Sequence, residues 1–158
     1  RDEAVDFELA TTSIFEDIFG YQAKHLGQTG KKSAPDVLLI SDEDGYQAII
    51  DNKAYSSYSI TGDHHNRMVH NYIGNIDGYS DYRLPIGFFS YIAGGFASNI
   101  DKQIQYEFDE SNIPGSAISV GNMIKLVEQQ QDQPYTHEEL RRLFSMNRQI
   151  RLEDLSRR

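Results

Sequence analysis

The sequence predicts an α/β protein in which a single domain, residues 1–158, has a central mixed β-sheet flanked by helices. Segments whose apolar residues recur every three or four positions alternate with apolar runs that are too short for a helix. This alternation is typical of helices and strands that pack in layers. A length of 158 residues also suits one domain with a substantial core, and no repeat or linker-like stretch divides the chain.

The first third of the chain predicts a helix followed by two strands. Apolar positions at helical spacing predict a helix over residues 3–19, and Gly20 is typical of the residue that ends one. The apolar run 37–40 and the segment 46–54 predict strands. Residues 41–45 between them end in Asp-Gly, which favours a hairpin, so we expect the two strands to be antiparallel neighbours.

The rest of the chain predicts further alternation of helices and strands. Asp63 is expected to cap a helix whose apolar stripe includes Met68 and Tyr72. The elements predicted after it are a strand over 83–93, a helix over 100–108, a strand over 117–120, a helical turn over 123–127 and a helix that begins with a capping box at Thr136. Residues 148–158 show weak periodicity, and we expect a frayed tail there.

Composition restricts the possible functions. Lys and Arg number 15 against 24 Asp and Glu, and the resulting charge of −9 argues against a free-standing nucleic-acid binder. The absence of cysteine excludes disulfides, thiolate metal sites and a thiol nucleophile, and is consistent with a cytosolic chain. The longest aliphatic run, 37–40, is far shorter than the roughly 20 residues of a membrane span. The chain begins at Arg1 instead of Met, which predicts a fragment of a larger protein.

One group of residues carries recognisable chemistry. Asp36 precedes the first predicted strand, and Asp51 and Lys53 share one face of the second, because strand residues two apart point the same way. Two carboxylates and the backbone carbonyl of Asn52 form an oxygen site suited to Mg²⁺. An adjacent ammonium orients water and offsets charge, so the group predicts metal-assisted phosphodiester hydrolysis. The alternative is a turn aspartate and a solvated ion pair without catalytic function.

A wider resemblance favours the catalytic interpretation. Residues 20–27, Pro35-Asp36 and residues 50–56 resemble the cleavage domain of the type IIS restriction endonuclease FokI, a member of the PD-(D/E)XK nuclease superfamily. The resemblance implies a restriction-endonuclease-like fold, with Asp36 and Asp51 as metal ligands, Lys53 as the catalytic lysine and Glu8 as an added acidic helix residue. It implies Mg²⁺ as cofactor, with Mn²⁺ or Ca²⁺ as substitutes. Asn52 stands where FokI has Thr, a change that leaves the backbone carbonyl in place.

The same resemblance implies partners. Asp63 and Arg67 match a pair through which the family's cleavage domains form transient homodimers; the alternative is an ordinary ion pair between residues four apart on one helix. Lys24 and His25 match a loop of the family and are candidate phosphate contacts on double-stranded DNA, or simply surface residues. The resemblance further implies a bacterial, cytoplasmic protein in which a separate domain recognises the DNA sequence.

We therefore expect a Mg²⁺-dependent DNA endonuclease domain that cuts without sequence specificity, is targeted by a separate recognition domain and makes double-strand cuts as a dimer. Two alternatives remain: a monomeric nicking or repair-type nuclease, and a catalytically inactive protein-interaction module on the same fold. His64, His65 and His70 contain no pair four residues apart, the spacing of a zinc-binding helix face, so we expect solvated helix residues there.

Overall fold

A computed structural model describes residues 3–27 and 33–156. Six strands form one mixed sheet in the order β1-β2-β3-β4-β5-β6. The first three strands are antiparallel neighbours, and the pairings from β3 to β6 are parallel. The strands are β1 (Gln22–His25), β2 (Val37–Ser41), β3 (Tyr46–Lys53), β4 (Ile86–Ala93), β5 (Gly115–Ser119) and β6 (Arg148–Gln149).

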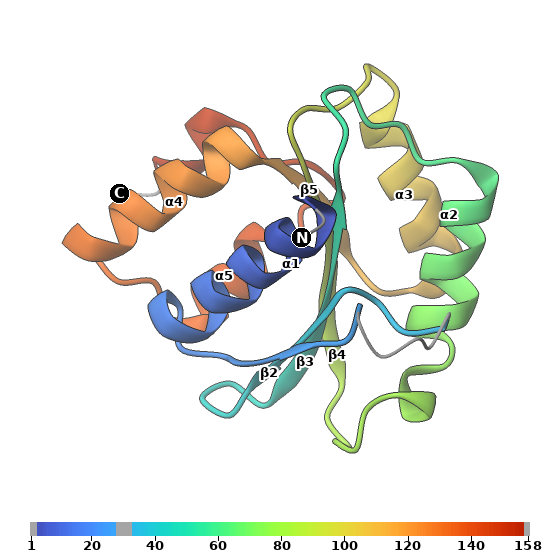
Figure 1. Ribbon diagram of the computed structural model, residues 1–158, viewed down its shortest axis with the longest axis horizontal. Coiled ribbons are helices and arrows are strands. Elements are labelled where there is room, and N and C mark those ends of the chain that lie inside the picture. The colour runs from blue at the N-terminus through green and yellow to red at the C-terminus, as the bar shows by residue number, and fades with distance from the viewer. Residues whose placement is uncertain (1–2, 28–32, 157–158) are drawn as a thin grey trace.

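Helices cover both faces of this sheet, which confirms the predicted fold class (Figure 1). Helices α1, α4 and α5 pack on one face, and α2 and α3 pack on the other. The helices are α1 (Glu3–Ser13), α2 (Gly62–Asn66), α3 (Ile100–Ser111), α4 (Val120–Asp132) and α5 (His137–Leu143), and π-helical segments extend α1 over Ile14–Ile18 and α2 over Arg67–Ile73. Among the described residues, no helix has both the length and the apolar character needed to cross a membrane.

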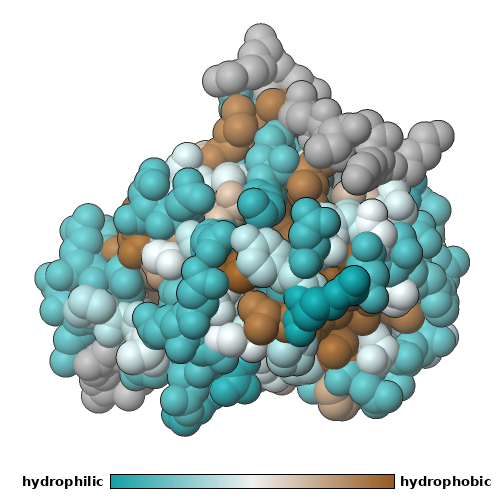
Figure 2. Space-filling model, turned by 90° about the horizontal axis from the view of Figure 1, so that it is seen from below, coloured by the Kyte–Doolittle hydropathy of each residue, from teal (hydrophilic) through white to brown (hydrophobic). Residues whose placement is uncertain are grey.

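The sheet separates two hydrophobic cores, because its strands send alternate side chains to opposite faces. In β3, Ala48 and Ile50 join the core beneath α1, α4 and α5, whereas Ile49 joins the core beneath α2 and α3. On the face of the molecule that Figure 2 shows, hydrophilic side chains predominate and hydrophobic ones form small separate areas, as is usual for a globular domain. The alternation within β3 also decides which side chains share a face with Asp51.

Several predicted boundaries are confirmed. The first helical stretch ends before Gly20, whose φ of +79° is a left-handed conformation that glycine adopts without strain. β2 and β3 pair antiparallel across the predicted turn, where Gly45 has a φ of +70°. The capping box at Thr136 is present, with its side chain accepting from Glu139 N.

Other expectations are corrected. The cap of α2 is Thr61, not Asp63: the Thr61 hydroxyl accepts the backbone N–H of His64 at 3.1 Å, and Asp63 lies in the first turn. In the segment expected to fray, β6 pairs with β5, and a 3₁₀ turn at Leu152–Leu155 buries Leu155 in the core. Residues 157–158 of that segment lie outside the part of the chain described.

Candidate active site

Pairing of β2 with β3 brings Asp36 beside Asp51. Val37 lies opposite Ile50 in the register, so the residue before Val37 meets the residue after Ile50. The backbone N–H of Asp36 donates to Asp51 Oδ1 at 3.4 Å, and the backbone N–H of Asn52 donates to Asp36 Oδ2 at 2.8 Å. The two carboxylates, 15 residues apart in the chain, are therefore held together by the sheet itself.

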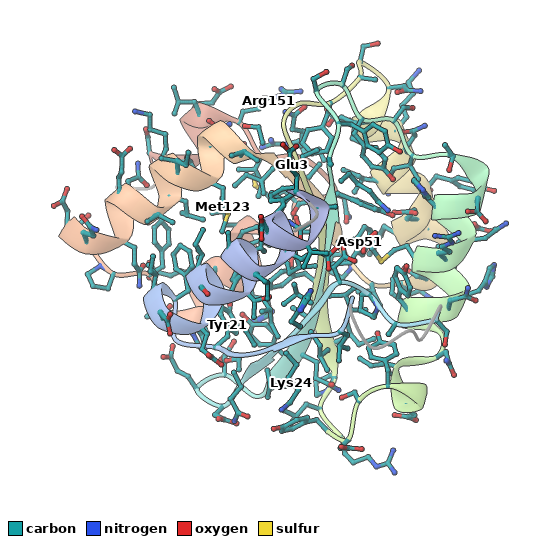
Figure 3. The ribbon with its side chains drawn as sticks, viewed as in Figure 1. Glu3, Tyr21, Lys24, Asp51, Met123 and Arg151 are labelled. Carbon is teal, nitrogen blue, oxygen red and sulfur yellow. The ribbon has the colours of Figure 1, made fainter. Side chains whose placement is uncertain are left out.

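Lys53 lies on the same face of β3 as Asp51, as the two-residue spacing predicts. Its Nζ is 2.8 Å from Asp51 Oδ2, and the exposed fractions of the two side chains are only 13% and 5%. Figure 3 shows Asp51 on the side of the sheet that faces α2 and α3. An ammonium and two carboxylates thus meet in a largely desolvated position, where their mutual electrostatic interactions are strong.

The electrostatics of the pair favour the arrival of a cation. Burial, followed by the negative charge of Asp51, raises the pKa of Asp36 to about 8, although the hydrogen bond from Asn52 N acts in the opposite direction. Asp36 therefore keeps its proton at neutral pH when no metal is bound, because a second negative charge beside Asp51 is unfavourable. A divalent cation between the two carboxyl groups would favour release of this proton, because its positive charge stabilises both carboxylates.

Glu8 of α1 lies near the pair of Asp36 and Asp51, on the side of Asp36. Its Oε1 accepts a hydrogen bond from His25 Nε2 at 2.7 Å, and both side chains are 14% exposed. A Cβ placed on Gly27 would clash with Glu8 Oε1 and lie 3.2 Å from Asp36 Oδ1. The carboxylates of Glu8 and Asp36 therefore approach the same point of the backbone, which only glycine leaves open.

The donor set fits a hard cation that keeps part of its water shell. Asp36 and Asp51 supply carboxylate oxygens, and oxygen ligands of this kind suit Mg²⁺, which is commonly held by one or two carboxylates. Asn52 turns its side chain away: Nδ2 donates to Thr11 Oγ1 at 2.8 Å, and Oδ1 is buried without a hydrogen-bond partner. Only its backbone is therefore close to the pair. Within residues 3–27 and 33–156, no cluster of three His, Cys, Asp or Glu side chains has the geometry to bind a metal.

The two candidate DNA contacts lie outside the carboxylate pair. Lys24 is exposed on the edge strand β1, with Nζ 6.0 Å from the centre of the Tyr82 ring, and Figure 3 shows it well apart from Asp51. His25 points to the other side of β1 and is engaged with Glu8. The expectation of a loop is wrong for these two residues: both lie in β1, and the strand directs their side chains to opposite faces.

Asp63 and Arg67 form the intrahelical ion pair that was the simpler interpretation of their spacing. Arg67 Nη2 lies 3.0 Å from Asp63 Oδ2, and the side chains are 47% and 69% exposed. An exposed pair of this kind contributes only about 0.3–0.5 kcal/mol to stability. Both side chains remain accessible from solvent.

The aromatic surroundings of Lys53 are not predictable from the sequence pattern. Its Nζ lies 5.8 Å from the centre of the ring of Tyr58, a residue in the irregular segment after β3. The expectation of solvated histidines was wrong for His64, which contacts the Tyr58 hydroxyl at 2.7 Å, and for His65, which bonds Glu110 and stacks on Tyr106. His70 is exposed as expected. No periodic pattern marks a contact between an irregular segment and a helix, so the sequence carried no signal for Tyr58.

The six-stranded mixed sheet with helices on both faces is the architecture of a restriction-endonuclease-like domain. The chain belongs to the FokI cleavage domain family: the family model described as "FokI, cleavage domain" matches residues 1–151. The predicted family and fold class are therefore confirmed.

Individual relatives agree with this assignment. The type II restriction enzyme StsI of Streptococcus sanguinis is 28% identical over 152 residues, which cover 89% of this chain and 24% of StsI. Structures of FokI alone and bound to DNA superpose with TM-scores of 0.76 at 23% and 25% identity, over 92% of this chain and 28% of FokI. The small subunit of the heterodimeric restriction endonuclease R.BspD6I has a TM-score of 0.61 at 14% identity, over 87% of this chain and 75% of that subunit. The chain thus spans about a quarter of StsI and FokI.

Proposed function

We propose that this chain is the Mg²⁺-dependent DNA endonuclease domain of a type IIS-like restriction enzyme in a bacterial cytoplasm. The observation that carries the proposal is the meeting of Asp36, Asp51 and Lys53 on one face where β2 and β3 pair. Membership of the FokI cleavage domain family supports the same reaction, hydrolysis of phosphodiester bonds. The domain itself would cut without choosing a sequence.

Asp36 and Asp51 would hold the metal through their carboxylates, with the backbone carbonyl of Asn52 as a further oxygen ligand. When bound, Mg²⁺ supplies Lewis-acid stabilisation of the charge that develops on the scissile phosphate. Mn²⁺ would substitute for it in catalysis, and Ca²⁺ would occupy the same oxygen ligands. Glu8, which approaches Asp36 at Gly27, would add a carboxylate at the margin of the site.

Lys53 would act on the attacking water. Its ammonium lies beside Asp51, so it is within reach of a water molecule that also contacts the metal site. A hydrogen bond from Nζ to that water orients a lone pair toward the phosphorus, and the positive charge offsets negative charge in the transition state. Asp51 holds the ammonium in this place by the 2.8 Å contact with Oδ2.

Delivery to DNA would depend on another domain. A net charge of −9 makes this domain a poor DNA binder on its own, because phosphate contacts require positive charge. Lys24, exposed on β1, would contribute a phosphate contact, and His25 would do so only on leaving Glu8. The chain spans about a quarter of StsI and FokI. An enzyme of similar length would therefore be long enough to include a separate recognition domain.

Double-strand cutting would require two copies, because one such site hydrolyses one strand. Asp63 and Arg67 are exposed on α2 and its continuation, where a two-fold axis would let each pair with its counterpart in the other copy. The relative R.BspD6I is described as heterodimeric, which supports pairing of cleavage subunits. We therefore propose a transient homodimer formed on DNA.

Cleavage of supercoiled plasmid tests the proposal. Purified protein with Mg²⁺ should produce nicked and then linear DNA, and neither EDTA-treated protein nor the Lys53→Ala variant should do so. A folded, concentrated sample that leaves the plasmid intact would contradict the proposal and favour the inactive interaction module. A double-strand cutting rate that rises more steeply than protein concentration supports the dimer, and a linear rate favours the monomeric nicking enzyme.

A further inference from the structure

Tyr58 is a buried residue held firmly beside the Lys53 ammonium. Only 2% of its surface is exposed, its backbone N–H donates to Gly95 O at 2.9 Å, and its ring packs 5.6 Å from that of Tyr91. Lys53 Nζ lies 5.8 Å from the centre of the Tyr58 ring, within the range in which a cation is attracted to an aromatic face. The ammonium is therefore located by a carboxylate on one side and an aromatic ring on another.

His64 fixes the hydroxyl of Tyr58. The distance from Tyr58 Oη to His64 Nδ1 is 2.7 Å. Burial, and then the positive charge of Lys53, lowers the pKa of His64, so the ring is neutral at pH 7, and Nδ1 accepts in the tautomer that carries its proton on Nε2. Burial raises the pKa of Tyr58, so its hydroxyl keeps its proton and donates. The protonation states of the two residues are thus consistent with one directed hydrogen bond.

This hydrogen bond connects Lys53 to the helix that carries Asp63. His64 is the neighbour of Asp63 in the first turn of α2, and its backbone N–H is bound by the helix cap Thr61. A shift of α2 would move His64, and through it the Tyr58 hydroxyl and the ring beside Lys53. The contacts run without interruption from the helix surface to the ammonium.

We propose that Tyr58 and His64 are positioning residues for Lys53, and that they couple the position of α2 to the active site. The inference rests on the proposed role of Lys53 in cleavage. A lysine side chain has four rotatable bonds and carries about 2 kcal/mol of rotamer entropy, so its ammonium is placed accurately only where neighbours restrict it. Asp51 provides one such restriction, and the Tyr58 ring held by His64 provides the second.

Single-turnover cleavage at saturating DNA and Mg²⁺ tests the coupling. Tyr58→Phe keeps the ring and removes the hydroxyl, and His64→Ala removes the acceptor. Each should lower the rate constant by about 2- to 10-fold, the loss expected for one hydrogen bond, with DNA affinity unchanged. The double variant should lose no more than either single variant, because both remove the same contact. His70→Ala, an exposed histidine on the same helical stretch, is the matched control and should cleave like the wild type.

The NMR signal of the Lys53 side chain provides a readout independent of cleavage. In metal-free protein with isotope-labelled lysine, the Cε–Hε signal that Lys53→Ala removes should shift in Tyr58→Phe and in His64→Ala, and stay in place in His70→Ala. A shift in both variants together with the reduced rate constant supports the proposal. Unchanged rates or an unchanged Lys53 signal in folded variants overturn it, even if their melting temperatures fall, because that result indicates packing alone. If the wild type does not cleave DNA, the proposed function fails, whereas the Lys53 signal still decides whether Tyr58 and His64 position the ammonium.

Discussion

Replacing Asp36 by Asn should flatten the pH dependence of stability in the metal-free chain. Burial and the charge of Asp51 raise the pKa of Asp36 from 3.8 to about 8. At a pH between these two pKa values, Asp36 keeps its proton in the folded chain but has released it in the unfolded chain. Stability therefore falls as pH rises through this window, and the contribution of the protonated carboxyl is lost above about pH 8.

The size of the effect follows from the number of protons released on unfolding. One proton changes the free energy of unfolding by about 1.4 kcal/mol per pH unit, so Asp36 accounts for a loss of up to about 2.7 kcal/mol from pH 5 to pH 7. Burial also raises the pKa of Glu107 to about 8, which adds a slope of the same sign. Glu107 is present in both proteins, so the difference between the slopes of wild type and Asp36→Asn isolates Asp36.

Guanidinium unfolding in EDTA at pH 5, 6 and 7 measures both slopes. The wild type should lose stability more steeply than Asp36→Asn, by up to about 1.4 kcal/mol per pH unit. Asp17→Asn, which changes an exposed carboxylate, should keep the wild-type slope. Excess Mg²⁺ should reduce the slope of the wild type, because the metal binds the deprotonated carboxylates. Equal slopes for wild type and Asp36→Asn would show that burial beside Asp51 does not raise the pKa of Asp36.

Three further predictions concern individual residues. Asp51→Ala and Lys53→Ala should each abolish plasmid cleavage while unfolding stays cooperative, because each removes one member of the ion pair at the candidate site. Wild-type cleavage by either variant would contradict the site. Asp63→Ala should keep the melting temperature within about 2 °C of the wild type, because the exposed ion pair with Arg67 contributes little to stability. The same variant should make fewer double-strand cuts relative to nicks. Unchanged double-strand cutting would argue against the dimer. Gly27→Ala should displace the Glu8 carboxylate, because the added Cβ would clash with it, and should therefore reduce cleavage as Glu8→Gln does. If Glu8→Gln is impaired but Gly27→Ala is fully active, Glu8 does not act from its position beside Gly27.

The central part of the site could be predicted because its signals are local. The Asp-Gly turn sets the pairing of β2 with β3, and the two-residue period of a strand puts Asp51 and Lys53 on one face. Together these place Asp36 beside Asp51 without knowledge of the rest of the fold. Local pattern was sufficient there.

What the sequence did not predict depends on contacts between distant segments. β1 is a short edge strand with exposed Gln22 and Lys24, so it lacks the alternation of apolar residues that identifies a half-buried strand. β6 has only two residues and is stabilised by pairing with β5. Glu107 lies in a helix rich in polar residues, and its burial depends on the hydroxyl of Tyr91, which donates at 2.9 Å. Such pairings become visible only when the sheet and α3 are in place.

A crystal structure of the chain with Ca²⁺ would show whether Asp36 and Asp51 share one metal ion, because Ca²⁺ binds the same kind of oxygen ligands as Mg²⁺. We expect one ion within about 2.3–2.6 Å of oxygens from both Asp36 and Asp51 and of the Asn52 backbone carbonyl, with the Lys53 ammonium beside it. An ion bound elsewhere, or carboxylates of Asp36 and Asp51 that turn away from a shared ion, would contradict this expectation.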